Sequence, residues 1–497
     1  MQLTRTIRGH WLFCLLLVTG LALRIMTQFA YQPALLYIDS KKYLFGLDVQ
    51  LWGAFDPLGY TLIVLRPVLL VANLAVVAAL QHVAGIGMAV VLYLLLRRLG
   101  VNKWLAAIAT APVLLDGYQL VAEQTIMPDV MFEALVVAGM AVLLWRPRLG
   151  LGAVALAGPI LGLSAPVRQI GEALLLPALA YVLVASSGWR TRLLRGAVLT
   201  AGFAAPILLY MAYAAVSLHD GFELSNLGDE YLYGRAAHAA DCGTLRLPAS
   251  EWFLCPAPEA AATLGVDGLV NAGLPRDQAY WPTAPLPGPG ASYGKLQQDF
   301  AYSVIAQQPL RVAGDIAGDA VKLFALTRDG SQGDTPISRW QFQASYPYYP
   351  PGITATGATS ADVIFALRGG GGPARASRPL AAALRAYQLN GGYTPGPILA
   401  IALLAGAAGI VAWRHPGQRR LAFACLLTTT GAVVLLLGAD FYEFSWRYQL
   451  PALITLPAAG VLGATAIAPA LARLAQRYRR HTVTAPVAHE ERVLDAG

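Results

Sequence analysis

Long apolar runs alternate with short polar connections along the chain, and the runs have the length of membrane-spanning helices. A helix needs about 17–25 apolar residues to cross the hydrocarbon core of a bilayer. The candidate runs lie at 11–28, 75–96, 104–118, 128–145, 150–164, 172–187, 196–217, 395–412, 421–438 and 449–470. The pattern therefore predicts an all-α integral membrane protein with about ten transmembrane helices, in which 104–118 and 150–164 are the shortest spans.

Basic residues gather in every second connection, which sets the predicted orientation. Arginine and lysine are enriched in the cytoplasmic loops of membrane proteins. The basic connections hold Arg97, Arg98, Lys103, Arg146, Arg148, Arg190, Arg192, Arg195, Arg414, Arg419 and Arg420, and the tail adds Arg477, Arg479 and Arg480. This alternation predicts a multi-pass protein of the cell membrane with both termini in the cytoplasm. The first run follows Arg5 and Arg8 but lacks a clear signal-peptide cleavage site, so we expect a retained helix.

The exterior connections are expected to carry the polar structure. In the first, the apolar stretch Gly59 to Ala72 is interrupted by Arg66 and Pro67, which favours a helix lying along the membrane surface. The longest, about 218–394, is rich in Gly and Pro and predicts an irregular, partly helical insert with one helix at Phe300 to Leu326. The predicted domains are 1–217, the insert 218–394, the C-terminal helices 395–472 and a cytoplasmic basic tail 473–497.

Composition supports the membrane assignment and argues against a soluble globular protein and against a nucleic-acid-binding protein. Hydrophobic residues make up 56% of the 497 residues and charged residues 13%. A soluble domain carries about 25% charged residues, so too few are present to cover a water-soluble globule of this size. The net charge of +8 lies in short clusters between apolar runs, which is explained by topology and argues against nucleic-acid binding.

Two cysteines lie in the polar insert, and two lie in apolar runs. Cys242 and Cys255 are the only pair in the insert, whereas Cys14 and Cys425 are within predicted helices. Disulfides form in extracytoplasmic compartments, so an exterior insert favours a Cys242–Cys255 disulfide. The alternative is a pair of unpaired, buried thiols.

Ionisable residues near membrane depth are costly and are therefore candidates for function. Those expected in exterior loops or at exterior helix ends are Asp39, Lys41, Lys42, Glu123, Asp129, Arg168, Glu443 and Arg447. Such a mixture suits a substrate that offers a phosphate, held by cations, and a hydroxyl, deprotonated by a carboxylate. The alternative for each residue alone is a solvated loop charge, and His82, inside a predicted span, is more simply a packing residue.

Common nucleotide and metal motifs are absent from the sequence. It contains no G-x-x-x-x-G-K-[ST] loop, no H-E-x-x-H and no C-x-x-C pair, and the cytoplasmic loops are too short to bind a nucleotide. If the protein is an enzyme, we therefore expect its energy to come from an activated substrate on the exterior side, such as a lipid-linked sugar.

Five segments in order along the chain resemble one family. They are YIDSKKY (37–43), DPLGYTLIVLRP (56–67), QHVAGIGMAVVLYLLLRRLG (81–100), AEQTIMPDVMFEAL (122–135) and SWRYQLPALITLPAAG (445–460). The layout resembles the GT-C superfamily of polyprenyl-phosphate-sugar-dependent glycosyltransferases, which includes protein O-mannosyltransferases and the aminoarabinose transferases of lipid A. The insert and the lysine-poor, Ala/Arg-rich composition resemble actinobacterial members.

The resemblance implies an inverting transfer of a sugar from a polyprenyl-phosphate donor to an exterior acceptor, which could be protein, lipid or cell-wall glycan. It implies that Asp39 is the general base. We expect Arg447, Arg168, Lys41 and Lys42 to hold the donor phosphate, and Glu123, Asp129 and Tyr43 to bind sugar or acceptor. Many members place a second acidic residue beside the first, whereas Ser40 follows Asp39 here. We therefore expect metal-independent chemistry without a cofactor.

Two other classes compete with the enzyme. A transporter or lipid flippase would carry polar residues midway along several spans and Gly/Pro-broken helices in paired positions. A structural or assembly protein would not depend on Asp39. The charges gather instead at the exterior ends of the predicted helices, which favours the enzyme.

Overall fold

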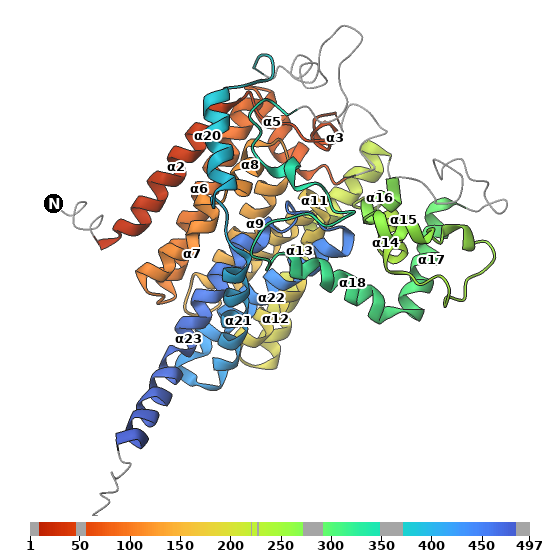
Figure 1. The fold of residues 1–497 in the computed structure, drawn as a ribbon. Helices are drawn as coiled ribbons and strands as arrows, with labels where there is room; N and C mark the ends of the chain where they lie inside the picture. Colours follow the sequence, from red (N-terminus) through yellow and green to blue (C-terminus); the bar gives the residue numbers. More distant parts are fainter. Residues whose placement is uncertain are drawn as a thin grey trace, which may run out of the picture.

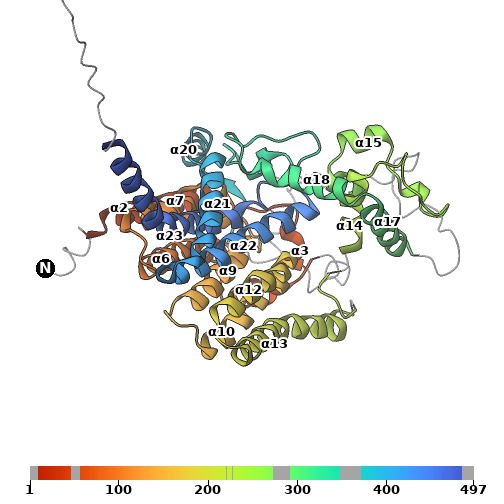
Figure 2. The same cartoon turned by 90° about the horizontal axis from the view of Figure 1, so that it is seen from below.

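The computed structural model describes residues 9–45, 56–219, 221–225, 228–271, 292–347 and 371–483. Its body is a bundle of long apolar helices (Figures 1 and 2). Among the described residues, six segments are long and apolar enough to cross a membrane: Trp11–Ala30, Leu74–Arg98, Trp189–Leu218, Gly396–Arg414, Pro416–Tyr442 and Leu450–Gln476. Within them lie α2 (Trp11–Ala30), α6 (Leu74–Arg98), α13 (Trp189–Tyr213) with η3 (Ala214–Leu218), α21 (Gly396–Val411) with η7 (Ala412–Arg414), η8 (Pro416–Gln418) with α22 (Arg419–Tyr442), and the start of α23 (Leu450–Val483).

The other predicted spans also fall on helices, but each of these is shorter than 18 residues. They are α7 (Lys103–Leu115), α9 (Asp129–Leu144), α10 (Leu151–Gly162) with α11 (Ser164–Val167), and η2 (Gln169–Leu174) with α12 (Leu175–Ala185). Helix α7 meets α8 (Gly117–Gln124) at a bend of 50°, and counting this pair as one span gives seven. The helical class is confirmed, and the predicted number of ten spans is not.

Small residues let α21 and α23 approach closely. A Cβ atom added to Gly463 would lie 1.9 Å from the carbonyl oxygen of Ala405, and one added to Gly460 would lie 2.7 Å from the Cα of Ala402. Helix pairs in membranes gain van der Waals contact by such close approach, because lipid offers no hydrophobic driving force between helices. This packing holds α23 in place, and with it the chain that leads into Leu450, its first residue.

The first connection folds back over one end of the bundle. After α2 come β1 (Tyr31–Gln32) and α3 (Ser40–Phe45), and the predicted surface helix is found as η1 (Thr61–Leu65), a π-helical turn, followed by α5 (Arg66–Leu69). Leu70 and Val71, just beyond α5, are 79% and 87% exposed. The helical character of this stretch agrees with the prediction, although a π-turn replaces part of the regular helix.

The insert begins as a separate helical unit beside the bundle (Figure 1). Its elements are α14 (Gly228–Ala239), η4 (Trp252–Leu254), α15 (Pro258–Thr263), α16 (Val266–Asn271), α17 (Tyr293–Gln307) and α18 (Pro309–Lys322). They surround a core that includes Tyr233, Leu254 and Phe300, and a disulfide joins Cys242 to Cys255. The single helix predicted at Phe300 to Leu326 is wrong: Pro309, which has no N–H to continue the ladder, starts a second helix.

The rest of the insert returns to the bundle. It forms η6 (Ile337–Trp340), β2 (Arg375–Ala376) and α20 (Arg378–Leu389), and β2 pairs antiparallel with β1. Arg328 donates to both carboxylate oxygens of Asp116 at 3.2 and 2.7 Å, and the Tyr346 hydroxyl donates to the Ala34 carbonyl at 2.8 Å. The chain from 328 to 346 is thereby held at one end against the junction of α7 and α8 and at the other against the first connection.

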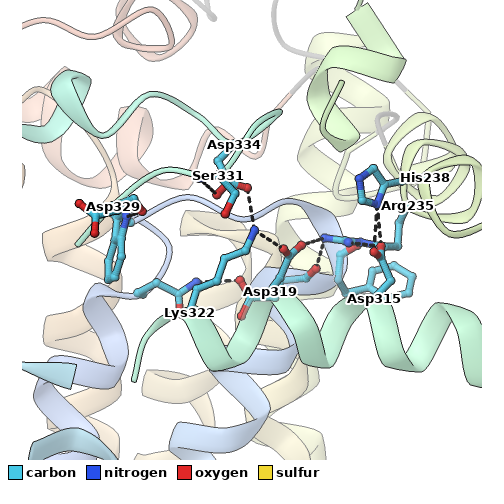
Figure 3. A network of polar contacts seen from close by, with 12 residues as sticks. Arg235, His238, Asp315, Asp319, Lys322, Asp329, Ser331 and Asp334 are labelled. Carbon is cyan, nitrogen blue, oxygen red and sulfur yellow. Dashed lines mark hydrogen bonds and ion pairs between the residues drawn. The ribbon is translucent and has the colours of Figure 1, made fainter. Parts of the chain in front are cut away.

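A buried arginine docks the helical unit of the insert onto the bundle (Figure 3). The side chain of Arg235, on α14, is 1% exposed; it pairs with Asp315 and Asp319 of α18 at 2.5 and 2.6 Å. The same guanidinium donates to the backbone carbonyls of Asp440 and Phe441, at the end of α22. Three elements far apart in the sequence therefore meet at one side chain.

Candidate active site

The first part of the site is built by α3 and the chain on either side of it. Asp39 immediately precedes α3, and Lys42 lies one turn later, so their side chains share a face. The Lys42 ammonium lies 3.2 Å from Asp39 and 3.1 Å from Asp56. These three side chains are each between one-fifth and one-third exposed. They are accessible at the rim of the bundle.

The second part comes from the connection between α22 and α23 and from two helix ends. Arg447 Nη1 lies 3.1 Å from Asp39, and its Nε lies 3.4 Å from Asp129 at the start of α9. Arg168, which follows α11, donates to Asp129 at 2.6 Å. The six residues form one charged cluster: Asp39, Lys42, Asp56, Asp129, Arg168 and Arg447. Its three carboxylates match its three cations.

Aromatic rings hold the two arginines of the charged cluster in place. The Arg447 guanidinium lies 4.7 Å from the Tyr448 ring and 5.4 Å from that of Trp340. Arg168 lies 5.0 Å from the Tyr448 ring and 5.7 Å from Phe132. Tyr448 therefore contacts both guanidinium groups, and such contacts are attractive because the face of the ring is electronegative.

A pocket of about 100 Å³ borders the charged cluster. Arg168, Arg447 and Asp56 line it, together with the aromatic side chains Tyr43, Tyr231, Tyr442 and Tyr448. Tyr231 belongs to α14, so the insert supplies part of the wall. Two cations, a carboxylate and several rings facing one space are suited to a ligand with an anionic group and polar hydroxyls.

The charges of the cluster fix the protonation of its members. Burial alone would raise the pKa of Asp39, but Lys42 and Arg447 outweigh it and hold the pKa below its ordinary value. Asp39 is therefore ionised at neutral pH. Burial, reinforced by Asp56 and Asp39, raises the pKa of Tyr43 well above its ordinary value, so its hydroxyl keeps its proton.

The structure brings most of the predicted residues together, but not Glu123. Glu123 is fully buried on α8, where it accepts from Arg24 at 2.6 Å and pairs with His82 at 2.8 Å. Arg24 also donates to the carbonyls of Val113 and Leu114. These contacts join α2, α6, α7 and α8, so Glu123 and His82 form an internal link between helices. Lys41 lies on α3 beside Lys42.

Sequence reasoning missed several contributors. Asp56 begins the segment DPLGYTLIVLRP (56–67) but was not among the predicted site residues. Tyr448 directly follows the predicted site residue Arg447. Trp340 and Tyr231 come from the insert, and no pattern in the sequence indicates which of its aromatic residues faces the bundle. Among the described residues, no group of three or more His, Cys, Asp or Glu side chains is placed to hold a metal ion.

Part of the chain is similar to a known protein family. The model of the dolichyl-phosphate-mannose-protein mannosyltransferase family matches residues 35–218, which is less than half of the chain. The matched region includes five of the six residues of the charged cluster, and Arg447 lies beyond it. Among curated proteins, no sequence matches the chain significantly.

Solved structures that are similar to this chain include two of an archaeal oligosaccharyltransferase from Archaeoglobus fulgidus. One is AglB in complex with an inhibitory peptide and a dolichol-phosphate, at 12% identity and a TM-score of 0.40, covering 97% of this chain and 52% of that one. The other is the apo form, at 13% identity and a TM-score of 0.43, covering 96% and 52%. The chain thus spans about half the length of these proteins.

Proposed function

We propose that this protein transfers a sugar from a polyprenyl-phosphate donor to an acceptor hydroxyl on the exterior side of the cell membrane. The observation that carries the proposal is that two guanidinium groups, Arg168 and Arg447, line one pocket and that Arg447 also pairs with the carboxylate of Asp39. Residues 35–218 are similar to a family of dolichyl-phosphate-mannose-protein mannosyltransferases, which supports a lipid-phosphate sugar as donor. The acceptor class, whether protein, lipid or glycan, is left open.

Arg168 and Arg447 are proposed to bind the donor phosphate, with Lys42 and Lys41 at the rim. Guanidinium groups bind phosphate oxygens through paired N–H donors. In the structure the three cations are paired with Asp39, Asp56 and Asp129. An arriving phosphate therefore competes with these carboxylates, and it weakens the hold of Arg447 on Asp39.

Asp39 is proposed to accept the proton of the acceptor hydroxyl. The hydroxyl oxygen attacks the anomeric carbon from the side opposite the phosphate, which inverts that centre. The new O–C bond forms as the C–O bond to phosphate breaks, the phosphate leaves with the bonding electrons, and the proton passes to Asp39. The low pKa of Asp39 makes it a weak base. Phosphate binding at Arg447 would raise that pKa and strengthen the base when a donor is present.

Asp129 and Tyr43 have different proposed roles. Asp129 is 1% exposed, and one of its oxygens lies within ion-pair distance of both arginines, so it is suited to position Arg168 and Arg447 beneath the pocket. Tyr43 lines the pocket with its hydroxyl protonated, and it can donate a hydrogen bond to a sugar or acceptor oxygen. The exposed apolar residues at the end of α5, Leu70 and Val71, are suited to the polyprenyl chain.

The direct test is transfer from a radiolabelled polyprenyl-phosphate sugar by the purified protein in nanodiscs, with a membrane extract as acceptor. We expect Asp39→Asn to lower kcat by about 100-fold or more, the usual contribution of a general base, because the amide cannot take the proton. Donor binding should persist, since Arg168 and Arg447 remain.

Asp299→Asn is the matched control, because Asp299 is an exposed carboxylate of the insert that pairs only with Lys295 of its own helix among the described contacts. It should transfer sugar at the wild-type rate. Full activity of Asp39→Asn would remove Asp39 from the mechanism. Movement of intact donor across the membrane, without release of polyprenyl phosphate, would establish a flippase instead.

A further inference from the structure

A second cavity lies at the end of α22 opposite the charged cluster. The pocket of the cluster includes Ala439 and Tyr442 near the last turn of α22, whereas the second cavity is lined by Ala422, Phe423 and Leu426 near the first. A helix of 24 residues is about 36 Å long, so a membrane thickness separates the two. The second cavity therefore belongs to a different site from the sugar-transfer pocket.

The cavity is apolar and lies where three candidate spans end. It holds about 740 Å³ between the end of α12, the start of α13, the end of α21 and the start of α22. Trp189 and Trp413 stand at its edge and are 67% and 50% exposed. Exposed tryptophans at span ends mark the level of the lipid headgroups. An apolar space that opens at this level is suited to a lipid chain.

The two connections beside the cavity, 187–195 and 412–420, carry only positive charges. Arg192 lines the cavity and donates its Nε to the Ser186 carbonyl at 3.1 Å. Arg195 donates to the Ser186 hydroxyl at 3.1 Å, which brings a second guanidinium to the same turn. The segments 187–195 and 412–420 together contain six arginines and no acidic residue: Arg190, Arg192, Arg195, Arg414, Arg419 and Arg420. An anionic lipid brings net negative charge to these arginines, whereas a zwitterionic lipid brings none.

We propose that this cavity binds one anionic glycerophospholipid, with an acyl chain between α12, α13 and α22 and its phosphate at Arg192. Basic pockets between transmembrane helices attract anionic headgroups because the surrounding medium screens charge poorly. The site is independent of sugar transfer: its residues do not line the pocket of the charged cluster.

Native mass spectrometry of the full-length protein tests the site. The protein, purified in detergent, is titrated with equal amounts of dioleoyl phosphatidylglycerol and dioleoyl phosphatidylcholine. We expect the first to be retained at least fivefold better. Arg192→Gln should abolish this preference, because the phosphate loses its nearest cation. Leu426→Trp should narrow the cavity and reduce retention of both lipids.

Arg246→Gln provides the matched control, since it removes the same charge from an exposed position of the insert. It should keep the wild-type preference, and the melting temperature of each variant shows whether it is folded. Equal retention of the two lipids by the wild-type protein would overturn the proposal, as would a preference that survives in Arg192→Gln. Displacement of phosphatidylglycerol by equimolar farnesyl phosphate would identify the site as one for polyprenyl phosphate instead.

Discussion

At the scale of single residues, several side chains of the site each contact two partners. Asp129 serves two arginines, Arg447 serves two carboxylates, and Tyr448 contacts both guanidinium groups. The sequence predicts most of the charged residues of the site, because ionisable residues near membrane depth are costly and therefore rare. The sequence does not predict which of these residues pair, because partners such as Asp39 and Arg447 are 408 positions apart. For the same reason Glu123, which looks similar to Asp129 in the sequence, belongs to a different cluster.

Tyr448 offers a test of how the arginines are spaced. Tyr448→Leu removes the ring between Arg168 and Arg447, and each cation–π contact is worth about 0.5–2 kcal/mol. We expect KM for the donor to rise about 10-fold while kcat changes little, because the ring positions cations that bind ground state and transition state alike. Steady-state kinetics with varied donor concentration measure the split.

Tyr448→Phe is the conservative comparison, since it keeps the ring and removes only the hydroxyl. It should retain a KM close to that of the wild-type protein. If Tyr448→Phe and Tyr448→Leu impair the enzyme equally, the hydroxyl and not the ring face is what matters.

At the scale of elements, the sequence predicted where helices occur better than where membranes are crossed. All ten apolar runs fall on helices, yet only six helical segments have the length of a span. Hydropathy reports burial in apolar surroundings, and the interior of a helical bundle meets that condition as well as lipid does. Helix α9, with 16 residues, shows this: twelve of them are buried. Breaks such as the one at Pro309 depend on local packing as well as on proline itself.

The connection between α22 and α23 carries a pH-sensitive carboxyl. Burial, with Asp267 nearby, raises the pKa of Glu443 to about 8, and the Thr335 hydroxyl donates to it at 2.7 Å. The folded protein therefore binds this proton more tightly than the unfolded chain does. The stability it contributes is present below pH 4.5 and is lost as pH rises to about 8, at up to about 1.4 kcal/mol per pH unit.

Glu443→Gln should remove this dependence, because an amide stays neutral throughout the range. Thermal melting between pH 5 and pH 9 should show a shallower decline for Glu443→Gln than for the wild-type protein, and a higher melting temperature at pH 9. Parallel curves for the two proteins would mean that Glu443 is ionised in the folded state at neutral pH.

At the scale of the whole molecule, the two largest hydrophobic cores of the described residues are joined through polar contacts. One core runs through the bundle, and the other fills the helical unit of the insert, which a disulfide closes. Composition predicted this division into membrane helices and a polar insert. It could not predict the docking, because Arg235 is a single arginine whose partners Asp315 and Asp319 lie on another helix and whose further acceptors are backbone carbonyls.

Arg235→Ala should loosen the docking. Removing one partner of a buried ion pair leaves uncompensated charge, at a cost of about 3–5 kcal/mol. We expect the insert to become sensitive to limited proteolysis and donor KM to rise, since Tyr231 on α14 lines the pocket. Arg311→Ala, whose side chain is 57% exposed and lies 4.0 Å from Asp241, should change stability by less than about 1 kcal/mol. Equal protease sensitivity of the two variants would show that Arg235 does not dock the insert.

The distance along the chain between Asp39 and Arg447 also orders events during synthesis. The ribosome makes the first connection early, but Arg447 emerges only just before α23. Until then Asp39, Lys42 and Asp56 exist as a partial cluster without the arginine that ties them to Asp129. A nascent or prematurely terminated chain therefore lacks the completed charge set. The site is complete only after α22 and the connection that follows it have been made.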